Sequence, residues 1–263
     1  MPELIEVEYY RLAVDPLIGA HVRALEVQPA NYLRTDGSGT RTLSHLVGTR
    51  LKATSRRGKL MLLHLADSTG AETQLGLRFG MTGRLLVDGS GPIEQLEYSS
   101  SRNDPGWDRV RLDFDGTALV IRDQRCLGAL EIQPDLDRLG PEVTELDADA
   151  WNRILQKRGK SIKGVLLDQS IVAGLGNLLT DEILWRAGLA PHRPANSLAT
   201  EEVAVLAKTV PTVVGELHDR GGSNCGDSFV LRSAGSVCSR CGGEMSHASV
   251  GQRSTWWCPR HQR

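Results

Sequence analysis

The C-terminal tail constrains the fold most, because it holds two pairs of metal-ligating side chains and too few apolar residues for a core. The pairs, sixteen residues apart, are Cys238-Ser239-Arg240-Cys241 and Cys258-Pro259-Arg260-His261. Two such pairs complete a tetrahedral zinc site, and a closed site of this kind stabilises a segment that cannot fold alone. We therefore predict one structural Zn2+ with Cys238, Cys241, Cys258 and His261 as ligands. His247, which lies between the pairs, is the alternative fourth ligand, and a set of reduced thiols without metal is the alternative to the site as a whole.

The net charge gives no sign of a nucleic-acid partner, but the charge distribution does. The 31 Lys and Arg residues nearly balance the 32 Asp and Glu residues, so the formal net charge is −1. Residues 1–150 carry 17 basic and 23 acidic residues, a balance of −6, whereas residues 151–263 carry 14 and 9, a balance of +5. A basic half is expected where part of a surface binds a polyanion, and chance scatter is the alternative.

Neither a targeting segment nor a membrane segment is expected. The N-terminus, Met1-Pro2-Glu3-Leu4-Ile5-Glu6-Val7-Glu8, has acids where a signal peptide would be basic and then apolar. No apolar run approaches the roughly 18 residues that a transmembrane helix needs. We therefore expect a cytoplasmic protein without a membrane partner, in which clustered cysteines bind metal rather than form disulfides.

Apolar periodicity predicts a mostly antiparallel β domain with one N-terminal helix, followed by a helical part. A helix is expected from Glu3 to about Leu17, then strands over Arg50–Leu65, Gln74–Leu86 and Arg109–Arg122, the last folded back at Asp115-Gly116. The later helices are expected over Ala148–Arg158, Ser161–Gln169, Leu178–Ala187 and Thr200–His218, the first capped by Asp147 or Asp149. An acidic segment with two prolines connects the two parts.

Two segments of the helical part have features of phosphate-binding sites. Gly174-Leu175-Gly176-Asn177 joins two apolar helices, and its glycines would let the backbone approach a phosphate at the N-terminus of the second helix. Basic residues precede it at Lys157, Arg158, Lys160 and Lys163, yet a plain turn stays an equal alternative. In the tail, Gly251–Trp257 is expected to form a hairpin arm that presents Arg253 to a phosphate, with its tryptophans covering the zinc site.

The N-terminus itself carries a potential nucleophile. Removal of Met1 would expose the secondary amine of Pro2 at the positive end of the first helix. The helix dipole would lower the pKa of this amine, whose free reference is about 7.7–8.0, so that an unprotonated form can attack a carbonyl or a sugar C1′ and form a Schiff base. Glu3 and Glu6 are near enough for acid or base chemistry. The alternative is that Pro2 merely starts a helix.

These features together resemble the formamidopyrimidine-DNA glycosylase and endonuclease VIII family of DNA repair glycosylases. The family's motifs occur in order along essentially the whole chain. They are the opening Met1–Glu8, Arg56-Arg57-Gly58-Lys59 as a strand start, Gly80-Met81-Thr82-Gly83, the region from Leu166-Leu167-Asp168-Gln169 through Gly174–Asn177 to Asp181–Leu184, and the zinc finger.

The resemblance implies an α+β fold. It consists of an N-terminal antiparallel β-sandwich with an N-terminal helix, then a helical helix–two-turn–helix domain with a C-terminal zinc-finger β-hairpin. The expected parts are a catalytic β-sandwich domain over 1–132, an interdomain linker over 133–147, the helix–two-turn–helix DNA-binding domain over 148–222 and the zinc finger over 223–263.

The resemblance also implies a bifunctional DNA glycosylase and abasic-site lyase of base excision repair. The amine of Pro2 would attack C1′ of the damaged nucleotide, and Glu3 would protonate the deoxyribose ring oxygen and assist β,δ-elimination. Lys59 would contact a phosphate beside the lesion and support catalysis. Glu6 and Glu182 would be the buried acids that order the site.

The implied partner is damaged double-stranded DNA, with single-stranded or bubble DNA as further candidates, bound by a monomer. Met81 would fill the space left by the flipped base, Arg125 would contact the orphaned partner base, and Leu127 would be a wedge beside it. Lys160, Asn177 and Arg253 would bind phosphates. Because DNA would lie in a basic cleft between the domains, binding is expected to depend strongly on salt despite the neutral total charge.

Departures from the family pattern concern recognition of the lesion. Ile5 replaces a proline in the opening motif, so the first turn would have a different conformation. Cys126 replaces an arginine and Leu127 a phenylalanine, and the smaller Leu127 would stack less well on the partner base. Gly221–Val237 is shorter than the loop that caps 8-oxoguanine, and Leu231-Arg232-Ser233 replaces a Y-G-R. We expect weak excision of 8-oxoguanine and a preference for oxidised pyrimidines, formamidopyrimidines or another bulky lesion.

Two other functions stay open at this point. One is a non-excising DNA-binding paralogue that recognises abasic or distorted DNA. The other is a zinc-binding scaffold that contacts another protein. A pure binder would need the phosphate contacts but neither the free amine nor the catalytic acid.

Overall fold

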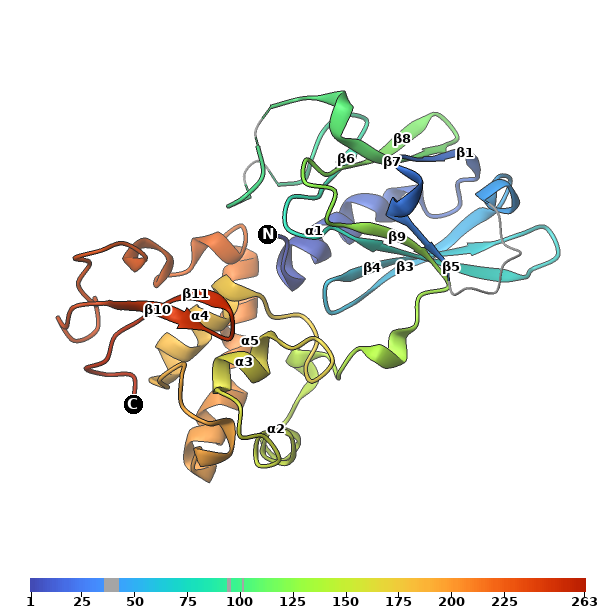
Figure 1. Ribbon diagram of the computed structural model, residues 1–263. Helices are drawn as coiled ribbons and strands as arrows, with labels where there is room; N and C mark the ends of the chain where they lie inside the picture. Colours follow the sequence, from blue (N-terminus) through green and yellow to red (C-terminus); the bar gives the residue numbers. More distant parts are fainter. Residues whose placement is uncertain (36–42, 94–95, 101) are drawn as a thin grey trace. The chain divides into compact units, whose positions relative to one another are not determined.

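The chain folds into two units, which are described separately. A computed structural model describes residues 1–35, 43–93, 96–100 and 102–263. The first unit spans Met1–Asp137 and the second Arg138–Arg263 (Figure 1).

The first unit is a sandwich of two sheets beside one helix. The four-stranded sheet has the order β1-β7-β8-β6 and is antiparallel throughout. The five-stranded sheet has the order β2-β9-β5-β4-β3 and departs from the expected antiparallel pattern only where β2 pairs with β9 in parallel. The strands are β1 Val22–Val27, β2 Leu33–Thr35, β3 Arg50–Arg57, β4 Leu60–Ala66, β5 Glu72–Arg78, β6 Arg84–Val87, β7 Asp108–Phe114, β8 Thr117–Arg122 and β9 Ala129–Ile132.

The strand boundaries correct two of the expected elements. The strand expected over residues 50–65 is the hairpin of β3 and β4, joined by Gly58-Lys59. The strand expected over residues 74–86 is β5 and β6, which belong to different sheets. Apolar periodicity alone could not separate these pairs, because buried residues continue on both sides of each turn. The turn expected at Asp115-Gly116 does connect β7 to β8, and both residues have positive φ.

One apolar core holds both sheets and the helix α1, which spans Leu4–Val14. In β7 the apolar residues Val110, Leu112 and Phe114 alternate with polar ones and are buried, as a half-exposed strand requires. The helix contacts β3 and β4 of one sheet and β6 of the other (Figure 1), with Tyr10 against Phe79 at 4.6 Å between ring centroids. The expected helix to Leu17 ends early, because a 3-10 turn over Asp15–Leu17 contains Pro16.

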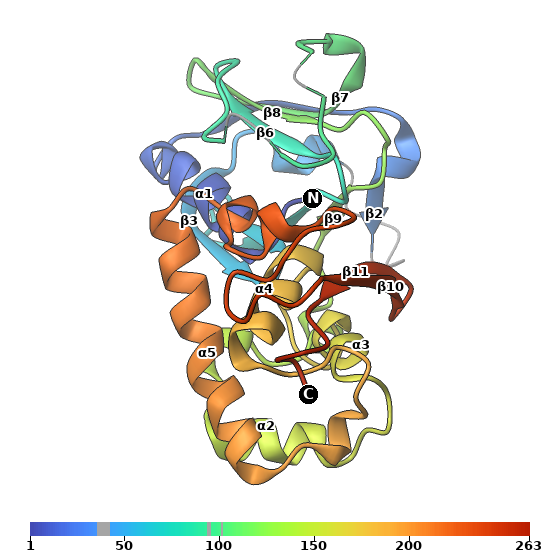
Figure 2. The ribbon, with the colours of Figure 1, turned by 90° about the vertical axis from the view of Figure 1, so that its left-hand side faces the viewer.

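The second unit is helical and ends in a β-hairpin. Its helices are α2 Ala148–Leu155, α3 Ile162–Leu167, α4 Asn177–Ala187 and α5 Thr200–Asp219, and its hairpin pairs β10 Ser246–Val250 with β11 Arg253–Trp257. Asp147 caps α2 by accepting the Ala150 N–H, so the open choice of N-cap is settled for Asp147. Figure 2 shows α5 as the long helix that packs on α4 and α2.

The helix α4 is the buried element of this unit. Every residue from Asn177 to Trp185 is buried, and the helix ends at Gly188, which has the left-handed conformation that favours glycine at a C-cap. Contacts with α3, α5 and β11 cover it. Both of its ends are therefore fixed by packing.

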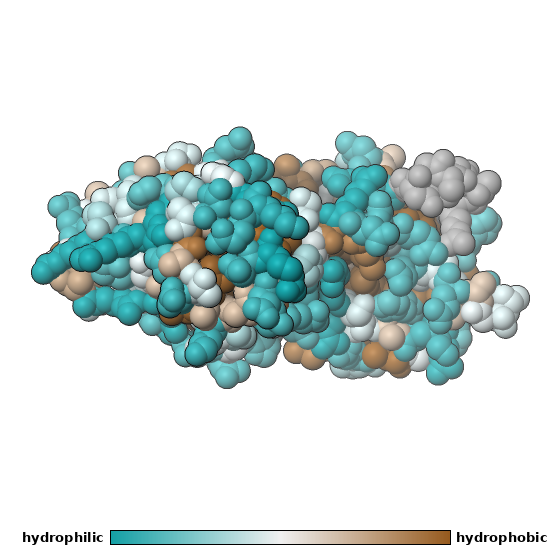
Figure 3. Space-filling model, turned by 90° about the horizontal axis from the view of Figure 1, so that it is seen from below, coloured by the Kyte–Doolittle hydropathy of each residue, from teal (hydrophilic) through white to brown (hydrophobic). Residues whose placement is uncertain are grey.

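No helix in the described part of the chain is long and apolar enough to cross a membrane. On the face drawn in Figure 3, hydrophilic residues predominate and hydrophobic residues occur in small patches.

Candidate functional site

The chain start of the first unit is a buried, acidic helix N-terminus. Pro2 and Glu3 are buried, and Glu3 is the N-cap residue of α1. The Glu6 carboxylate, itself 2% exposed, accepts the Glu3 backbone N–H at 2.8 Å. Glu3 and Glu6 thus lie together in the first turn, which is the arrangement expected from the opening motif.

The α-amine of Met1, the residue before Pro2, has a lowered pKa. The chain described here keeps Met1, and the pKa of the Met1 α-ammonium lies below its ordinary value because burial disfavours its charge. The carboxylates of Glu3, Glu97 and Glu6 oppose this effect, and the charge of Lys59 adds to it. Burial is therefore the largest of these effects on the Met1 amine, and Lys59 lies within electrostatic range of the chain start.

Lys59 lies in the turn of the β3–β4 hairpin and not at a strand start. Arg57 pairs with Leu60, so Gly58 and Lys59 form a two-residue loop. Gly58 has φ +56°, the positive value that the first position of a type I′ or II′ turn requires. The motif R-R-x-K thus places two arginines on the last residues of β3 and the lysine at the tip.

Met81 and Arg125 are brought together by two loops that cross between the sheets. Residues 79–83 lead from β5 to β6, and residues 123–128 lead from β8 back to β9. The Arg125 guanidinium donates to Met81 Sδ at 3.8 Å, and Leu127 is 45% exposed beside them. Met81 is thus a half-buried loop residue, which favours the wedge over a core methionine.

The buried carboxylate of Asp123 joins these two loops. It is fully buried and accepts hydrogen bonds from the Leu127 and Gly128 N–H groups, each at 2.8 Å, and from the hydroxyl of Thr82. The Thr82 hydroxyl in turn accepts the Arg125 N–H at 3.2 Å. A weaker bond comes from the Tyr32 hydroxyl at 3.3 Å. Sequence reasoning missed this role of Asp123, although the residue opens the same motif as Arg125.

The close approach of the loops also requires glycine at two positions. A Cβ on Gly80 would lie 2.6 Å from the carbonyl carbon of Leu127, and φ at Gly80 is +58°. A Cβ on Gly128 would overlap the Tyr32 hydroxyl. Cys126 takes a positive φ of +52°, which is unusual for a residue with a side chain. The backbone conformation of residues 79–83 and 123–128 is therefore tightly constrained.

In the second unit, two of the expected phosphate-binding residues, Asn177 and Arg253, lie where α4 and β11 meet. Asn177 is the first residue of α4, and its side-chain amide donates to the Ser254 carbonyl at 3.1 Å. Lys163 donates to the same carbonyl at 3.3 Å. Arg253, the neighbour of Ser254, is exposed at the start of β11, and Lys160 is exposed 3.7 Å from Asp168.

Lys163 does not belong to the basic cluster that was expected beside a phosphate. Its side chain is fully buried and forms an ion pair with Asp181 at 2.5 Å, and Asp181 also pairs with Arg232. A buried, paired ammonium holds elements together and is not available to a phosphate. The signal that could have identified it is its position between Ile162 and Val165, both of which are buried.

Glu182 ties the short segment after α5 to α4. Its carboxylate is buried, accepts the Ser228 N–H at 2.7 Å and forms an ion pair with Arg186 at 2.7 Å. A Cβ on Gly226 would come within 2.7 Å of the same carboxylate. The residues that follow Gly226 are therefore held against α4.

Three cysteines and one histidine form the expected metal centre. The ligand atoms of Cys238, Cys241, Cys258 and His261 all lie within 4.8 Å of one another. His247 is excluded, because its ring stacks on Trp256 at 4.4 Å and its Nε2 bonds Ser254 Oγ at 2.9 Å. Thiolates and an imidazole at these separations fit one tetrahedral Zn2+, so the finger carries a structural zinc.

The metal centre is attached to the C-terminal end of α4. His261 Nε2 lies 3.0 Å from the Trp185 carbonyl, which leaves Nδ1 for the metal, and the Trp185 indole donates to Cys238 Sγ at 3.4 Å. Arg240 donates to the Trp185 and Arg186 carbonyls at 2.9 and 2.7 Å. Sequence reasoning did not identify Trp185 or Arg240, because their partners are distant in the chain.

The two tryptophans of the hairpin differ in position. Trp256 packs on the cluster that contains Cys238, Cys258 and Trp185, as expected of a residue that covers the zinc site. Trp257 instead lies against His192, with ring centroids 5.7 Å apart.

Comparison with known proteins covers both units. The formamidopyrimidine-DNA glycosylase N-terminal domain matches residues 1–130, the H2TH domain of the same enzymes matches residues 139–226, and the zinc finger found in FPG and IleRS matches residues 235–260. The formamidopyrimidine-DNA glycosylase of Heliobacterium modesticaldum is 35% identical over 100% of both chains. That of Streptococcus pneumoniae R6 is 31% identical over 100% of this chain and 99% of the relative.

Solved structures give the same result. The Lactococcus lactis Fpg in complex with DNA that contains an abasic site matches with a TM-score of 0.82 and 26% identity, over 100% of both chains. The same protein in complex with DNA that contains an oxidized pyrimidine matches with a TM-score of 0.82 and 27% identity, over 100% of both chains.

We predict that the zinc site supports α4 as well as the tail. His261→Ala should lose the metal, and the near-ultraviolet signal of buried Trp185 should change because His261 and Arg240 hold its backbone carbonyl. His247→Ala is the matched control and should keep one zinc per chain by metal analysis. Full zinc retention in His261→Ala, or a finger that is folded without zinc, would contradict the assignment.

We predict that Asp123→Asn destabilises the first unit by about 2 kcal/mol or more, because an amide keeps only one acceptor oxygen. If that oxygen accepts the Leu127 and Gly128 N–H groups, the NH2 group faces the buried Thr82 hydroxyl, which loses its acceptor, and the charge that strengthens all of these bonds is gone. Tyr32→Phe removes only the 3.3 Å bond and is the control, with an expected loss below about 1 kcal/mol. Urea unfolding measures both losses. Equal stability of Asp123→Asn and the parent chain would show that the carboxylate does not hold the loops.

Proposed function

The chain belongs to the formamidopyrimidine-DNA glycosylase family, and we propose that it is a bifunctional DNA glycosylase and abasic-site lyase with the amine of Pro2 as nucleophile. The observation that carries this proposal is the buried first turn of α1, where Glu3 follows Pro2 directly and Glu6 bonds the Glu3 backbone. The amine of Met1 has a lowered pKa through burial, and the amine of Pro2, which is itself a buried residue, would be subject to the same effect once Met1 is removed. It would therefore be partly unprotonated near neutral pH, as nucleophilic attack requires.

In the proposed reaction, the Pro2 nitrogen forms a bond to C1′ of the damaged nucleotide and the bond from C1′ to the base breaks. Glu3 donates a proton to the ring oxygen, and the opened sugar is a Schiff base on Pro2. Loss of the C2′ proton then expels the 3′ phosphate by β-elimination, and a further elimination expels the 5′ phosphate. Water then hydrolyses the Schiff base, which releases the sugar remnant as an aldehyde, restores the Pro2 amine and leaves a one-nucleotide gap, the product expected of a base excision repair enzyme.

The remaining residues of the proposed site bind and order the substrate. Lys59, at the tip of the β3–β4 hairpin, would contact a phosphate beside the lesion. Glu6 orders Glu3 through its backbone bond, and Glu182 orders the segment around Ser228.

The proposed partner is damaged double-stranded DNA, with single-stranded and bubble DNA as further candidates. Met81, Arg125 and Leu127, which lie on the two joined loops, would occupy the space of the flipped base and contact its partner. In the second unit, Lys160, Asn177 and Arg253 would bind phosphates. Functional parts over 1–132, 133–147, 148–222 and 223–263 are part of the same proposal.

A weak activity on 8-oxoguanine is proposed from the segment after α5. Gly221–Val237 is short, and its Ser228 is bonded to buried Glu182, so little free chain is left to close over a flipped purine. Smaller or non-planar lesions, such as oxidised pyrimidines and formamidopyrimidines, need less cover. The Lactococcus lactis relative has been solved with both classes of lesion, Fapy-dG and an oxidized pyrimidine.

We predict that the chain, once Met1 is removed, forms a covalent adduct with abasic-site duplex in the presence of borohydride. Glu3→Gln should abolish the adduct, because it removes the proton donor, and Pro2→Gly should reduce it strongly, because a mobile primary amine replaces the secondary amine that the proline ring holds in place. Glu26→Gln, at an exposed acid on β1, is the control and should form the adduct normally. Absence of an adduct from a chain that begins at Pro2 would refute the lyase, and an adduct without release of any damaged base would favour the non-excising paralogue.

We predict that release of 8-oxoguanine opposite cytosine is slower than release of an oxidised pyrimidine or a formamidopyrimidine by about tenfold or more, about 1.4 kcal/mol of transition-state stabilisation. Single-turnover rates on matched duplexes that differ only in the lesion measure this ratio. Equal or faster release of 8-oxoguanine would show that a short, anchored segment is enough to hold that base.

A further inference from the structure

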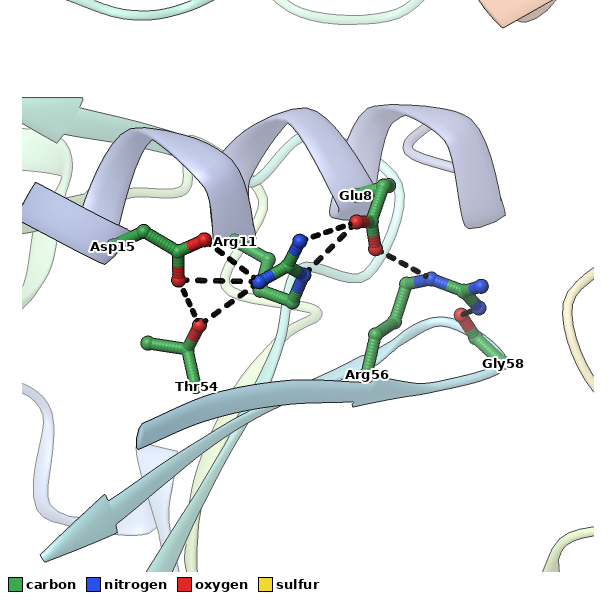
Figure 4. Close-up of polar contacts among 6 residues, drawn as sticks. All are labelled: Glu8, Arg11, Asp15, Thr54, Arg56 and Gly58. Carbon is green, nitrogen blue, oxygen red and sulfur yellow. Dashed lines mark hydrogen bonds and ion pairs between the residues drawn. The ribbon is translucent and has the colours of Figure 1, made fainter. Parts of the chain in front are cut away.

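A polar network links the second turn of α1 to the hairpin that carries Lys59. Figure 4 shows its six residues, which come from α1, the residue after it, β3 and the β3–β4 turn. Glu8 on α1 binds the Arg56 guanidinium at 3.2 Å, and Arg56 donates to the Gly58 carbonyl at 2.8 Å. The chain of contacts from α1 therefore ends on the peptide bond that leads into Lys59.

The Gly58 carbonyl is a sensitive point for the direction of Lys59. It belongs to the peptide plane between Gly58 and Lys59, and the orientation of that plane depends on two dihedral angles of a tight turn. Glycine has the widest freedom of these angles, so the turn needs an external contact to hold one conformation. The Arg56 side chain supplies such a contact, and it does so from the strand that immediately precedes the turn.

Glu8 in turn holds the guanidinium of Arg56. The two side chains are 26% and 14% exposed, so the pair is only partly screened by water. Burial acts to raise the pKa of Glu8, but hydrogen bonds and charges from Arg11 and Arg56 outweigh it and hold that pKa below its ordinary value. Glu8 is thus ionised at neutral pH and accepts bonds from both arginines.

The other end of the network is a matched reference. Arg11 bonds Glu8 at 2.7 Å and Asp15 at 2.9 Å, and Thr54 bonds Arg11 at 3.2 Å as well as Asp15. These contacts fasten the C-terminal half of α1 to the middle of β3. Arg11 also bonds Glu8, but the contacts among Arg11, Asp15 and Thr54 include neither Glu8, Arg56 nor Gly58, and they involve the same kinds of groups at similar burial.

We propose that Glu8 is a positioning residue for Lys59, acting through Arg56 and the Gly58 carbonyl. This inference rests on the proposed function, in which Lys59 supports catalysis beside Pro2. In this proposal α1 positions two residues of the site. Pro2 lies just before the start of the helix, and Glu8 in its second turn orients Lys59. Glu8 touches neither the substrate nor the reacting atoms.

The test is a double-mutant cycle between Glu8→Ala and Lys59→Ala, measured as single-turnover cleavage of an abasic-site duplex. Glu8→Ala should slow cleavage by about tenfold, less than the roughly hundredfold cost of a 1 Å misplacement. In the Lys59→Ala background the same change should have almost no further effect, because the residue that it positions is absent. Glu8→Gln, which still accepts a bond from Arg56, should restore most of the rate.

Thr54→Val is the control for the network as a whole and should leave the cleavage rate unchanged, although it removes contacts with Arg11 and Asp15. Urea unfolding of each variant separates loss of folded protein from loss of rate. Multiplicative effects of Glu8→Ala and Lys59→Ala, or a rate for Thr54→Val as low as that for Glu8→Ala, would overturn the inference. Absence of cleavage by the unchanged chain would instead refute the proposed function.

Discussion

Burial of the first turn of α1 is the constraint on which the proposed chemistry depends. It removes Pro2, Glu3 and Glu6 from bulk water and lowers the pKa of the α-amine of Met1, the residue before Pro2. The helix can be buried there because both sheets pack against it. The site is therefore a property of the whole sandwich, and a change in how α1 packs would alter the amine before it altered any contact with DNA.

The second unit depends on one buried helix in a similar way. The zinc centre is fixed to the last turn of α4 through Trp185, while Asn177 at its first turn holds the Ser254 carbonyl beside Arg253. The hairpin is therefore held at its base by the zinc centre and nearer its turn by Asn177. The near-neutral total charge of the chain is compatible with such a surface, because it averages exposed Lys160 and Arg253 with an acidic first half.

The motifs and the metal ligands could be predicted from the sequence, because each depends on spacing along the chain. The ligand spacing indicated zinc, and the order of the motifs indicated the family. The strand boundaries could be predicted less well from the sequence. Apolar residues occur on both sides of Gly58-Lys59 and on both sides of residues 79–83, so periodicity could not show where one strand ends. Asp123 and Lys163 were missed because their functions depend on partners that only folding brings near. The Asp123 carboxylate accepts hydrogen bonds from both loops that connect the two sheets, and Lys163 is buried in an ion pair with Asp181.

The central claim is that the nitrogen of Pro2 forms the bond to the sugar. Its most direct test is mass spectrometry of the borohydride-trapped complex after digestion of protein and DNA. The account predicts that the sugar remnant is attached to the N-terminal peptide, at Pro2, in a chain that has lost Met1. Attachment to Lys59 or to another lysine, with the Pro2 amine unmodified, would contradict it.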